Sequence, residues 1–256
     1  MRSRTAVVSL ACFVLGAVVS LGASYGTRFG LWDYPTGLKL LAPGFLLGLA
    51  GSAAGALWLA RALIGNNSAG WKLGVVGLAG SLLVIFVPLN ELRLYLVSPP
   101  IHDISTDPEF PPRFVALLPL RSGAQNGPDY DGANIVTVDG KRTTVAAAQK
   151  KAYPDIKPYF ALLGAANRHP QTTQFWRAFE RAKSEGFDIV AYSEKDGTIE
   201  ATHTSFWFGL VQDIAIRARA AGRIGARVDI RVKSRTGEND AGAAAALVRS
   251  YLQAMR

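Results

Sequence analysis

The chain has 256 residues, of which 49% are hydrophobic and 18% are charged, against about 25% charged residues in ordinary soluble domains. This composition argues against a wholly soluble protein and indicates that part of the chain lies in a membrane. The net charge of +9 divides almost evenly between residues 1–97 and 98–256, and no clustered basic face results, so nucleic acid is not an expected partner.

Cysteine content and motif content narrow the chemistry further. Cys12 is the only cysteine and lies in the first apolar segment, so the rest of the chain has no disulfide, no Cys nucleophile and no Cys-ligated metal. The sequence contains no HExxH, GxSxG or Walker-type glycine motif, the usual signatures of metal, acyl-transfer and nucleotide chemistry. We therefore expect no metal and no cofactor.

Three apolar segments without a charged residue occupy the N-terminal third. Each holds about 20 residues, enough to cross a bilayer as a helix, and Trp and Tyr residues lie near the ends as interfacial aromatics do. We expect an all-α transmembrane region over residues 1–97 and a soluble domain over residues 98–256. The expected spans are residues 5–27, 40–60 and 73–96. The first segment also fits a cleaved signal peptide, because arginines precede it and small residues follow it.

The basic residues predict an orientation, because positive residues favour the cytoplasmic side of a membrane. The basic residues before the first segment and between the second and third would lie on one side of the membrane, and they are Arg2, Arg4, Arg61 and Lys72. The basic residues between the first and second segments, Arg28 and Lys39, would lie on the other side. This distribution predicts a multi-pass protein of the cell inner membrane with a periplasmic C-terminal domain.

Small residues recur three or four positions apart in the second and third segments. They let helices approach closely, and packing of the three helices on one another is the more economical interpretation, with self-association between chains as the alternative. The residues are Gly44, Gly48, Gly51, Gly55, Gly74, Gly77 and Gly80. No ionisable residue lies in the middle of a segment, which argues against ion transport.

The soluble part opens with an extended, proline-rich stretch over residues 99–112, which should lie along the domain rather than form a helix. A Gly-, Asn- and Asp-rich loop follows. A short strand is expected at Ile135–Val138. Thr143 or Thr144 would then cap a helix that ends before Pro154.

A second helix of the soluble part has a clear apolar face. Thr172 or Thr173 would cap it, and Gly186 would end it in the left-handed conformation. The apolar face consists of Phe175, Ala178, Phe179 and Ala182. Asp240 would cap a third helix at the C-terminus.

Alternating apolar and polar residues predict strands between these helices. They are expected around residues 188–192, 198–206, 213–219 and 227–233. The last two form a hairpin in which Arg217 can face Asp229. Neighbouring strands with helices outside them indicate an α+β domain with an antiparallel sheet covered by helices on one face.

The other face of this sheet would be charged. Its side chains include Glu200, Asp213, Arg217, Asp229 and Arg231. The favoured interpretation is a solvated face with cross-strand ion pairs. We expect Arg217, Asp229 and Arg231 to form one shared charge network. If the proline-rich stretch covers this network, replacing Asp229 should destabilise the domain, because the two arginines would lose their partner.

Five motifs occur in an order that resembles the DUF1499 family, a domain of unknown function. They are IHDISTDPEFPPRF at residues 101–114, AYP at 152–154, IEATHTSFWFG at 199–209, DIAIR at 213–217 and VDIRVKSRTGENDAG at 228–242. The resemblance implies no established activity, substrate or catalytic residue. This chain has Gln212 and Asp213 where the family often has two adjacent acids, which puts any role that needs both carboxylates in doubt.

Two further patterns suggest binding. Ser234 and Arg235 leave a strand just before a helix begins, an arrangement suited to an anion. The favoured alternative is an ordinary turn in which Asp240 caps the helix and Arg235 pairs locally with it or with Glu238. Trp207, between two phenylalanines, belongs either to the core, which is the default, or to an aromatic patch at a membrane surface.

These patterns favour a non-catalytic binding or interaction domain of the cell envelope. The candidate binding residues are Glu200, Trp207, Asp213, Arg217, Asp229, Arg231, Ser234 and Arg235. The lipid bilayer is one partner, and an envelope protein, a lipid or an anionic ligand stays open as another. The alternative is an envelope hydrolase that uses Glu200, Asp213 and an arginine, although alternation places Glu200 and His203 on opposite faces of their strand.

Overall fold

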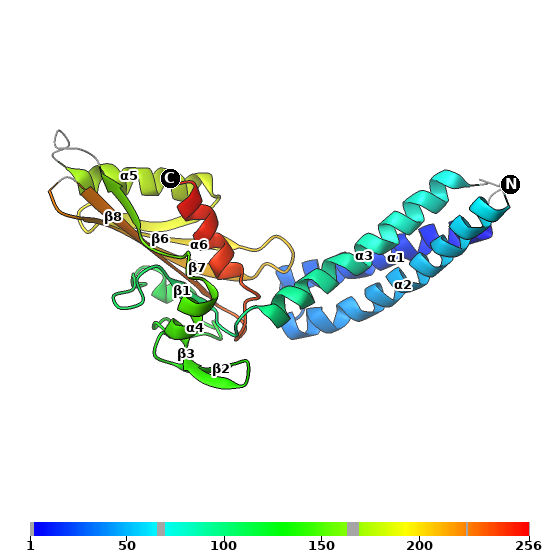
Figure 1. The fold of residues 1–256 in the computed structure, drawn as a ribbon, viewed down its shortest axis with the longest axis horizontal. Coiled ribbons are helices and arrows are strands. Elements are labelled where there is room, and N and C mark those ends of the chain that lie inside the picture. Colours follow the sequence, from blue (N-terminus) through cyan, green and yellow to red (C-terminus); the bar gives the residue numbers. More distant parts are fainter. Residues whose placement is uncertain (1–2, 66–69, 163–168, 224, 256) are drawn as a thin grey trace. The chain divides into compact units, whose positions relative to one another are not determined.

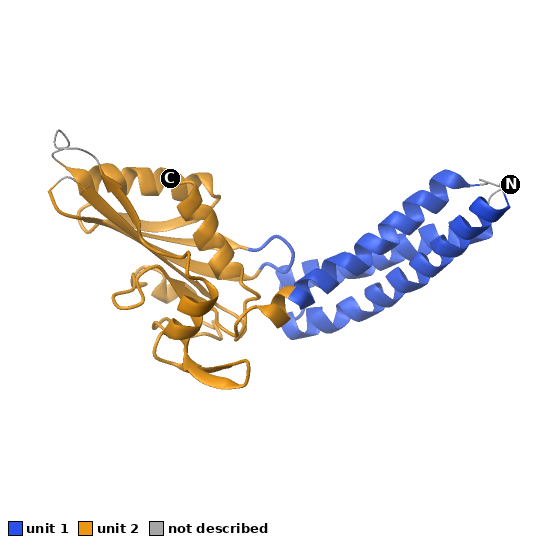
Figure 2. Ribbon diagram, viewed as in Figure 1, with its two compact units in different colours: residues 1–93, 205–209 blue, residues 94–204, 210–256 orange. Residues whose placement is uncertain are grey.

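The computed structural model describes residues 3–65, 70–162, 169–223 and 225–255 (Figure 1). The chain separates into two compact units (Figure 2). The helical unit comprises Met1–Arg93 together with Ser205–Gly209, and the α+β unit comprises Leu94–Thr204 with Leu210–Arg256.

In the part of the N-terminal region that the structure describes, there are three helices that are long and apolar enough to cross a membrane. They are α1 (Arg4–Arg28), α2 (Tyr34–Ile64) and α3 (Trp71–Val97). Asp33 caps α2, because its carboxylate accepts a hydrogen bond of 3.0 Å from the backbone N–H of Thr36. The three helices agree with the three membrane spans expected from the charge-free segments.

The small residues of α2 and α3 face the neighbouring helices, as predicted. A Cβ atom added to Gly44 would lie 3.0 Å from the carbonyl oxygen of Gly16 in α1. A Cβ atom on Gly77 would lie 2.6 Å from the backbone nitrogen of Leu10. Glycine is therefore required where the helix backbones approach most closely.

The α+β unit is built on an antiparallel sheet of six strands. The strands are β1 (Asp103–Ser105), β4 (Tyr159–Leu162), β5 (Asp188–Ser193), β6 (Thr198–Thr204), β7 (Val211–Ala220) and β8 (Gly225–Ser234), in the order β1-β8-β7-β6-β5 with β4 also paired to β8. A separate hairpin is formed by β2 (Ile135–Val138) and β3 (Lys141–Thr144). Arg217 lies opposite Asp229, as the alternation predicted.

Within its described residues, the α+β unit also contains three α-helices and one 3-10 helix. These are α4 (Val145–Ala152), α5 (Pro170–Ser184), α6 (Ala243–Gln253) and the 3-10 helix η1 (Leu118–Arg121). The expected cap by Thr144 is confirmed by its side-chain hydrogen bond to the first turn of α4. The expected cap by Asp240 is wrong in position, because Gly242 is the N-cap of α6, although the Asp240 carboxylate accepts a hydrogen bond from the N–H group of Ala244. The expected cap by Thr172 or Thr173 is wrong, because α5 begins at Pro170, a residue whose fixed φ suits the first helical position.

The apolar core lies between α5, α6 and one face of the sheet. Phe175, Ala178 and Ala182 of α5 are fully buried there, as their spacing predicted. They share this core with Val248 and Tyr251 of α6 and with the even-numbered residues from 214 to 218 of β7 and from 228 to 232 of β8. The α+β class and the helix-covered sheet are confirmed.

The opposite face of the sheet is not solvated, and this part of the sequence-based interpretation is wrong. Asp213 and Asp229 are 0% exposed. Residues 106–131, which we call the cover segment, lie over this face and contain only the 3-10 helix η1 as regular structure. Alternation along a strand identifies the face of a side chain, but it cannot show whether a distant segment covers that face.

We expect Gly77→Ala to destabilise the helical unit by about 1–3 kcal/mol, because the added methyl group would push against the backbone of α1. Gly22→Ala is the matched control, since nothing lies within 4 Å of the added atom, and it should be neutral or slightly stabilising. SDS unfolding of the full-length protein in mixed micelles, followed by circular dichroism, measures both. Equal effects of the two substitutions would contradict this packing.

Candidate functional site

The candidate site is the charged face of the sheet together with the cover segment. We call its side chains the charged layer. They are Glu200, Asp213, Arg217, Asp229, Arg231 and Lys233. They share one face because the odd-numbered residues of β7 and β8 lie opposite one another, and Glu200 is opposite Ala215.

Arg231 lies at the centre of the charged layer and is 2% exposed. Its guanidinium donates two hydrogen bonds to the carboxylate of Asp103, at 2.9 and 2.8 Å. It also donates to the carbonyl oxygens of Pro128 and Asp129 at 3.0 and 2.9 Å. The ring of Phe114 lies 4.5 Å from the guanidinium carbon, at cation–π distance. This one side chain thus joins β8 to β1 and to the cover segment.

Lys233 is 1% exposed, and its ammonium group is saturated with oxygen acceptors. It donates to the carbonyl oxygen of Asp129 and to the carboxylate of Asp131, both at 2.6 Å, and lies 3.4 Å from Asp103. A buried ammonium is tolerated only when it is paired in this way.

His102 extends this cluster to the C-terminal turn. Its Nε2 atom lies 3.0 Å from the carboxylate of Asp131, and its Nδ1 atom lies 3.0 Å from the carbonyl oxygen of Glu238. Both partners are acceptors, so the arrangement favours an imidazolium with two N–H groups. Burial opposes the charge, but the hydrogen bonds to Asp131 and Glu238 outweigh it and raise the pKa of His102.

Asp131 responds in the opposite sense. Burial alone would raise the pKa of its carboxyl group, but hydrogen bonds from His102 and Lys233 lower the pKa to about 2. Both shifts favour the charged forms, so they stabilise His102 and Asp131 as an ion pair.

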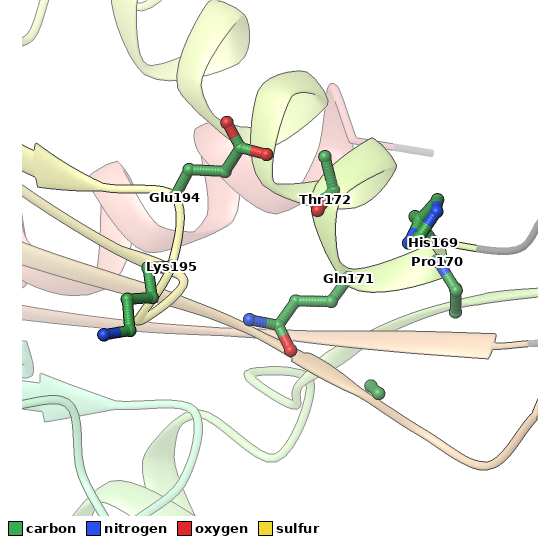
Figure 3. A pocket seen from close by; sticks show the side chains of 7 residues that line it. His169, Pro170, Gln171, Thr172, Glu194 and Lys195 are labelled. Carbon is green, nitrogen blue, oxygen red and sulfur yellow. The ribbon is translucent and has the colours of Figure 1, made fainter.

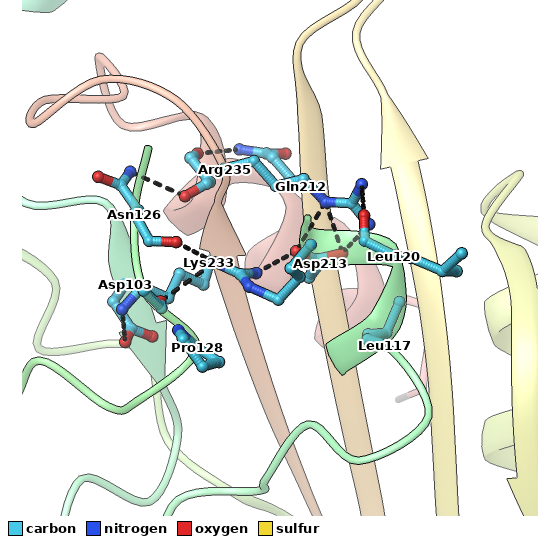
Figure 4. Close-up of polar contacts among 12 residues, drawn as sticks. Asp103, Leu117, Leu120, Asn126, Pro128, Gln212, Asp213, Lys233 and Arg235 are labelled. Carbon is cyan, nitrogen blue, oxygen red and sulfur yellow. Dashed lines mark hydrogen bonds and ion pairs between the residues drawn. The ribbon is translucent and has the colours of Figure 1, made fainter. Parts of the chain in front are cut away.

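Asp213 is held between two arginines that come from different parts of the chain. Figure 4 labels Asp213 and one of them, Arg235. Arg121, at the end of η1, pairs with one carboxylate oxygen and donates to the carbonyl oxygens of Asn126 and Gly127. Arg235 donates to both carboxylate oxygens of Asp213 at 2.7–3.1 Å and to the carbonyl oxygen of Leu120 at 2.7 Å. These contacts fix the cover segment to β7 and to the end of β8.

Glu200 binds the backbone of the cover segment directly. Its carboxylate accepts hydrogen bonds from the N–H groups of Val115, Ala116 and Leu117 at 2.9, 3.0 and 3.0 Å. Three successive N–H groups that converge on one carboxylate form an anion-binding turn, and here the anion belongs to the protein itself.

A third cluster surrounds Asp229 and Asp107. Three arginines share these two carboxylates, with N···O distances of 2.8–3.4 Å, and they are Arg217, Arg219 and Arg227. The expected network of Arg217, Asp229 and Arg231 is therefore only half right. Arg217 and Asp229 do pair, but Arg231 binds Asp103 instead.

The turn after β8 has little free capacity for an anion. All three guanidinium nitrogens of Arg235 donate hydrogen bonds, to the carboxylate of Asp213 and to the carbonyl oxygen of Leu120. The carboxylate of Asp240 accepts from the N–H groups of Gly242 and Ala244, which begin α6. The ordinary-turn alternative therefore describes the site better, although Arg235 pairs with Asp213 rather than with Asp240 or Glu238. Ser234 accepts a hydrogen bond of 3.2 Å from Gln212.

Trp207 lies outside the charged layer, in the connection between β6 and β7, and 41% of its surface is exposed. The default expectation of core packing is wrong for this residue. The five residues Ser205–Gly209 belong to the helical unit rather than to the apolar core of the α+β unit.

An open depression of about 630 Å³ lies elsewhere, at the start of α5 (Figure 3). Residues 169–172 line it together with Glu194 and Lys195 of the β5–β6 turn. None of the candidate residues from the sequence lines this depression. Within the described residues, no group of three His, Cys, Asp or Glu side chains is arranged to hold a metal ion.

Sequence reasoning missed several members of the site. Lys233 continues the alternation of β8 and could have been assigned to the charged layer on that ground. Asp103 and Asp107 lie within the first motif of the family resemblance, but the sequence does not reveal their partners. Arg121 and Asp131 come from irregular chain, where no periodicity indicates which way a side chain points.

Together, the three apolar helices and the helix-covered antiparallel sheet define a membrane-associated protein with an α+β domain. The chain belongs to the DUF1499 family, described as "Protein of unknown function (DUF1499)", whose model matches residues 103–255, more than half of the chain. The match contains the whole sheet and the cover segment. No curated protein and no solved structure matches the chain.

We expect Asp229→Ala to destabilise the α+β unit by about 1–3 kcal/mol, because three arginines lose the buried carboxylate they share. Arg217→Ala should cost less than about 1 kcal/mol, since Arg217 is partly exposed and Asp229 keeps two arginines. Hydrogen exchange of β7 and β8 peptides in the full-length protein measures the two variants side by side. The reverse order of effects would contradict this assignment.

The His102–Asp131 pair predicts a pH optimum of stability. The raised pKa of His102 means that its contribution is complete below about pH 6.5 and is lost as the pH rises through the raised pKa. The lowered pKa of Asp131 means that its contribution is present above pH 3.8 and is lost as the pH falls towards about 2. Both contributions are therefore complete between about pH 4 and 6.5.

His102→Gln tests this pair. The variant should remove the loss of stability above about pH 6.5, because glutamine does not titrate. The measurement is the urea midpoint of the full-length protein in detergent over a series of pH values. Parallel pH profiles of the variant and the unmodified protein would show that His102 is not the titrating group.

Proposed function

We propose that this protein is a membrane-anchored, non-catalytic binding domain of the cell envelope. It lies in the inner membrane with residues 98–256 on the periplasmic side. The single observation that carries the non-catalytic part is the occupancy of the charged layer. The carboxylates that a hydrolase would use are buried and are already bound to the chain's own arginines and backbone N–H groups.

The geometry also counts against the hydrolase alternative. A general base must reach a proton of a bound substrate, and a catalytic pair must lie within hydrogen-bond distance. Glu200 faces the cover segment, whereas the ring of His203 lies 6.2 Å from the ring of Phe187, a core residue. Glu200 and His203 therefore cannot act together. His102 is bound to Asp131 and to the backbone of Glu238.

Because the cover segment buries the charged layer, a partner would contact the outer surface of the domain instead. Binding modules commonly use a rigid scaffold and expose their recognition residues on the connecting segments. The buried ion pairs supply such a scaffold here, because they fix an irregular segment of 26 residues to the sheet. An envelope protein, a lipid or an anionic ligand fits this mode of binding.

The orientation rests on the distribution of basic residues. Arg4, Arg61 and Lys72 lie at the helix ends opposite those that carry Arg28 and Lys39. The positive-inside rule then supports a cytoplasmic N-terminus and, after three crossings, a periplasmic domain.

Reporter fusions test the orientation. We expect alkaline phosphatase to be active when fused after Ser98 and inactive when fused at Asn66, and a fluorescent cytoplasmic reporter should give the opposite pattern. The inverted result would place the domain in the cytoplasm and would overturn the periplasmic part of the proposal.

Conservative carboxylate variants test the non-catalytic part. Glu200→Gln and Asp213→Asn should each destabilise the α+β unit by about 1–3 kcal/mol, because buried N–H donors and guanidinium groups lose their charged acceptor. Catalytic residues behave differently, since their replacement commonly leaves stability unchanged or raises it. Hydrogen exchange of the cover-segment peptides in the full-length protein measures this effect. Unchanged or increased protection in both variants would favour the hydrolase.

A further inference from the structure

The connection between β6 and β7 carries three consecutive aromatic residues and is part of the helical unit. Figure 2 shows this connection, Ser205–Gly209, in the colour of the helices. Phe206 is 67% exposed and Trp207 is 41% exposed. Two large aromatic side chains at neighbouring positions of a short loop are costly to leave in water.

A charged hydrogen-bond donor holds this loop to the end of α1. The guanidinium of Arg28 donates to the carbonyl oxygens of Ser205 and Phe206 at 2.7 and 3.0 Å. Gly209 has a φ of +66°, and a Cβ atom there would lie 2.8 Å from the Cγ atom of Arg28. Glycine is thus needed both for the backbone conformation and for the close approach. The loop is fixed rather than loosely attached.

Aromatic contacts add to this attachment. The ring of Phe206 meets the ring of Tyr25 edge to face, with centroids 6.2 Å apart. The ring of Phe208 meets that of Tyr34 in the same geometry at 5.3 Å. Tyr25 lies in the last turn of α1, and Tyr34 begins α2. The loop therefore packs where the two helices are joined.

The level of these contacts along the helices can be estimated from the helical rise. Tyr25 lies about 14 Å along α1 from Gly16, the middle of its charge-free run, at 1.5 Å per residue. Tyr34 lies about 15 Å along α2 from Gly44, the residue of α2 that packs against Gly16. The hydrocarbon core ends about 15 Å from the midplane, and the headgroup region ends about 20–22 Å from it. The loop therefore lies at the interface where the hydrocarbon core meets the lipid headgroups.

We propose that Phe206 and Trp207 anchor the DUF1499 domain in the interfacial region of the bilayer. A lipid interface is the occupant that the surroundings favour. Tryptophan concentrates at this level of membrane proteins, which fits Trp207. Phe206 adds apolar area beside it, and the neighbouring Phe29 and Leu31 in the α1–α2 turn are also exposed. The helices that hold the loop also expose large apolar side chains, such as Leu21 and Leu38. The loop thus gives the domain a second attachment to the membrane, in addition to the chain that leaves α3.

This inference depends neither on which side of the membrane the domain occupies nor on whether it is catalytic. An anchor at the headgroup level works in either leaflet. If the anchor proved wrong, the membrane topology and the non-catalytic role would still be tested separately, by the reporter fusions and by the carboxylate variants.

Nitroxide labelling of the full-length protein in vesicles of phosphatidylethanolamine and phosphatidylglycerol tests the anchor. Cys12 is the only cysteine, so Cys12→Ala provides a background for Phe206→Cys and Trp207→Cys. Collision with oxygen, which concentrates in lipid, is compared with collision with a nickel chelate, which stays in water. We expect the ratio of oxygen to chelate accessibility at both positions to exceed the ratio at the aqueous control several-fold.

Two control positions have similar exposure. Phe160→Cys, in β4 of the α+β unit, is the aqueous control, because Phe160 is 60% exposed. Val18→Cys, in the middle of α1, is the lipid control. A ratio at Phe206 and Trp207 equal to that at Phe160 would overturn the anchor. Low accessibility to both reagents would also overturn it, since the loop would then be covered by protein.

A second measurement avoids the loss of the aromatic rings. Brominated lipids quench tryptophan fluorescence on contact, and Trp207→Phe removes one of five tryptophans while keeping an aromatic side chain. The quenched part of the emission should fall in the variant if Trp207 touches lipid. A loss of emission confined to the unquenched part would contradict the proposal.

Discussion

The structure of the α+β unit depends on a layer of charged side chains buried between a sheet and an irregular segment. Burying such charges is costly unless each finds a partner. The cover segment has almost no regular secondary structure, so its backbone groups also need partners. The same contacts satisfy both groups. Arg231 and Lys233 donate hydrogen bonds to carbonyl oxygens of the cover segment, and Glu200 accepts hydrogen bonds from its N–H groups. Sheet and cover therefore fold as one body.

The same layer limits what the domain can do. A carboxylate surrounded by its own arginines has no free lone pair aimed at a substrate, and an arginine paired on several sides has little left for an anion. The three clusters centred on Asp103, Asp213 and Asp229 thus explain why so polar a family motif need not indicate catalysis. Removing one partner of such a pair leaves a buried charge uncompensated, and this destabilises a protein more than replacing both partners with apolar residues.

The helical unit is organised by a different constraint. Lipid gives apolar helices no hydrophobic reason to associate, so close backbone contact at small residues takes over that role. Gly44 and Gly77 lie where a Cβ atom would meet the backbone of α1. Arg28 then links the end of α1 to the aromatic loop between β6 and β7. This loop, Ser205–Gly209, lies within the residues matched by the DUF1499 model, but it groups with the three long helices as part of the helical unit.

The sequence by itself determined the three membrane helices, the α+β class, the pairing of Arg217 with Asp229 and the core face of α5, because charge-free length and periodicity are local properties. It also identified the family. Only the tertiary structure decided that the charged face is buried, that Arg231 binds Asp103 and that Trp207 leaves the core. The reason is physical, since these outcomes depend on contacts between residues more than eighty positions apart, which no local pattern encodes.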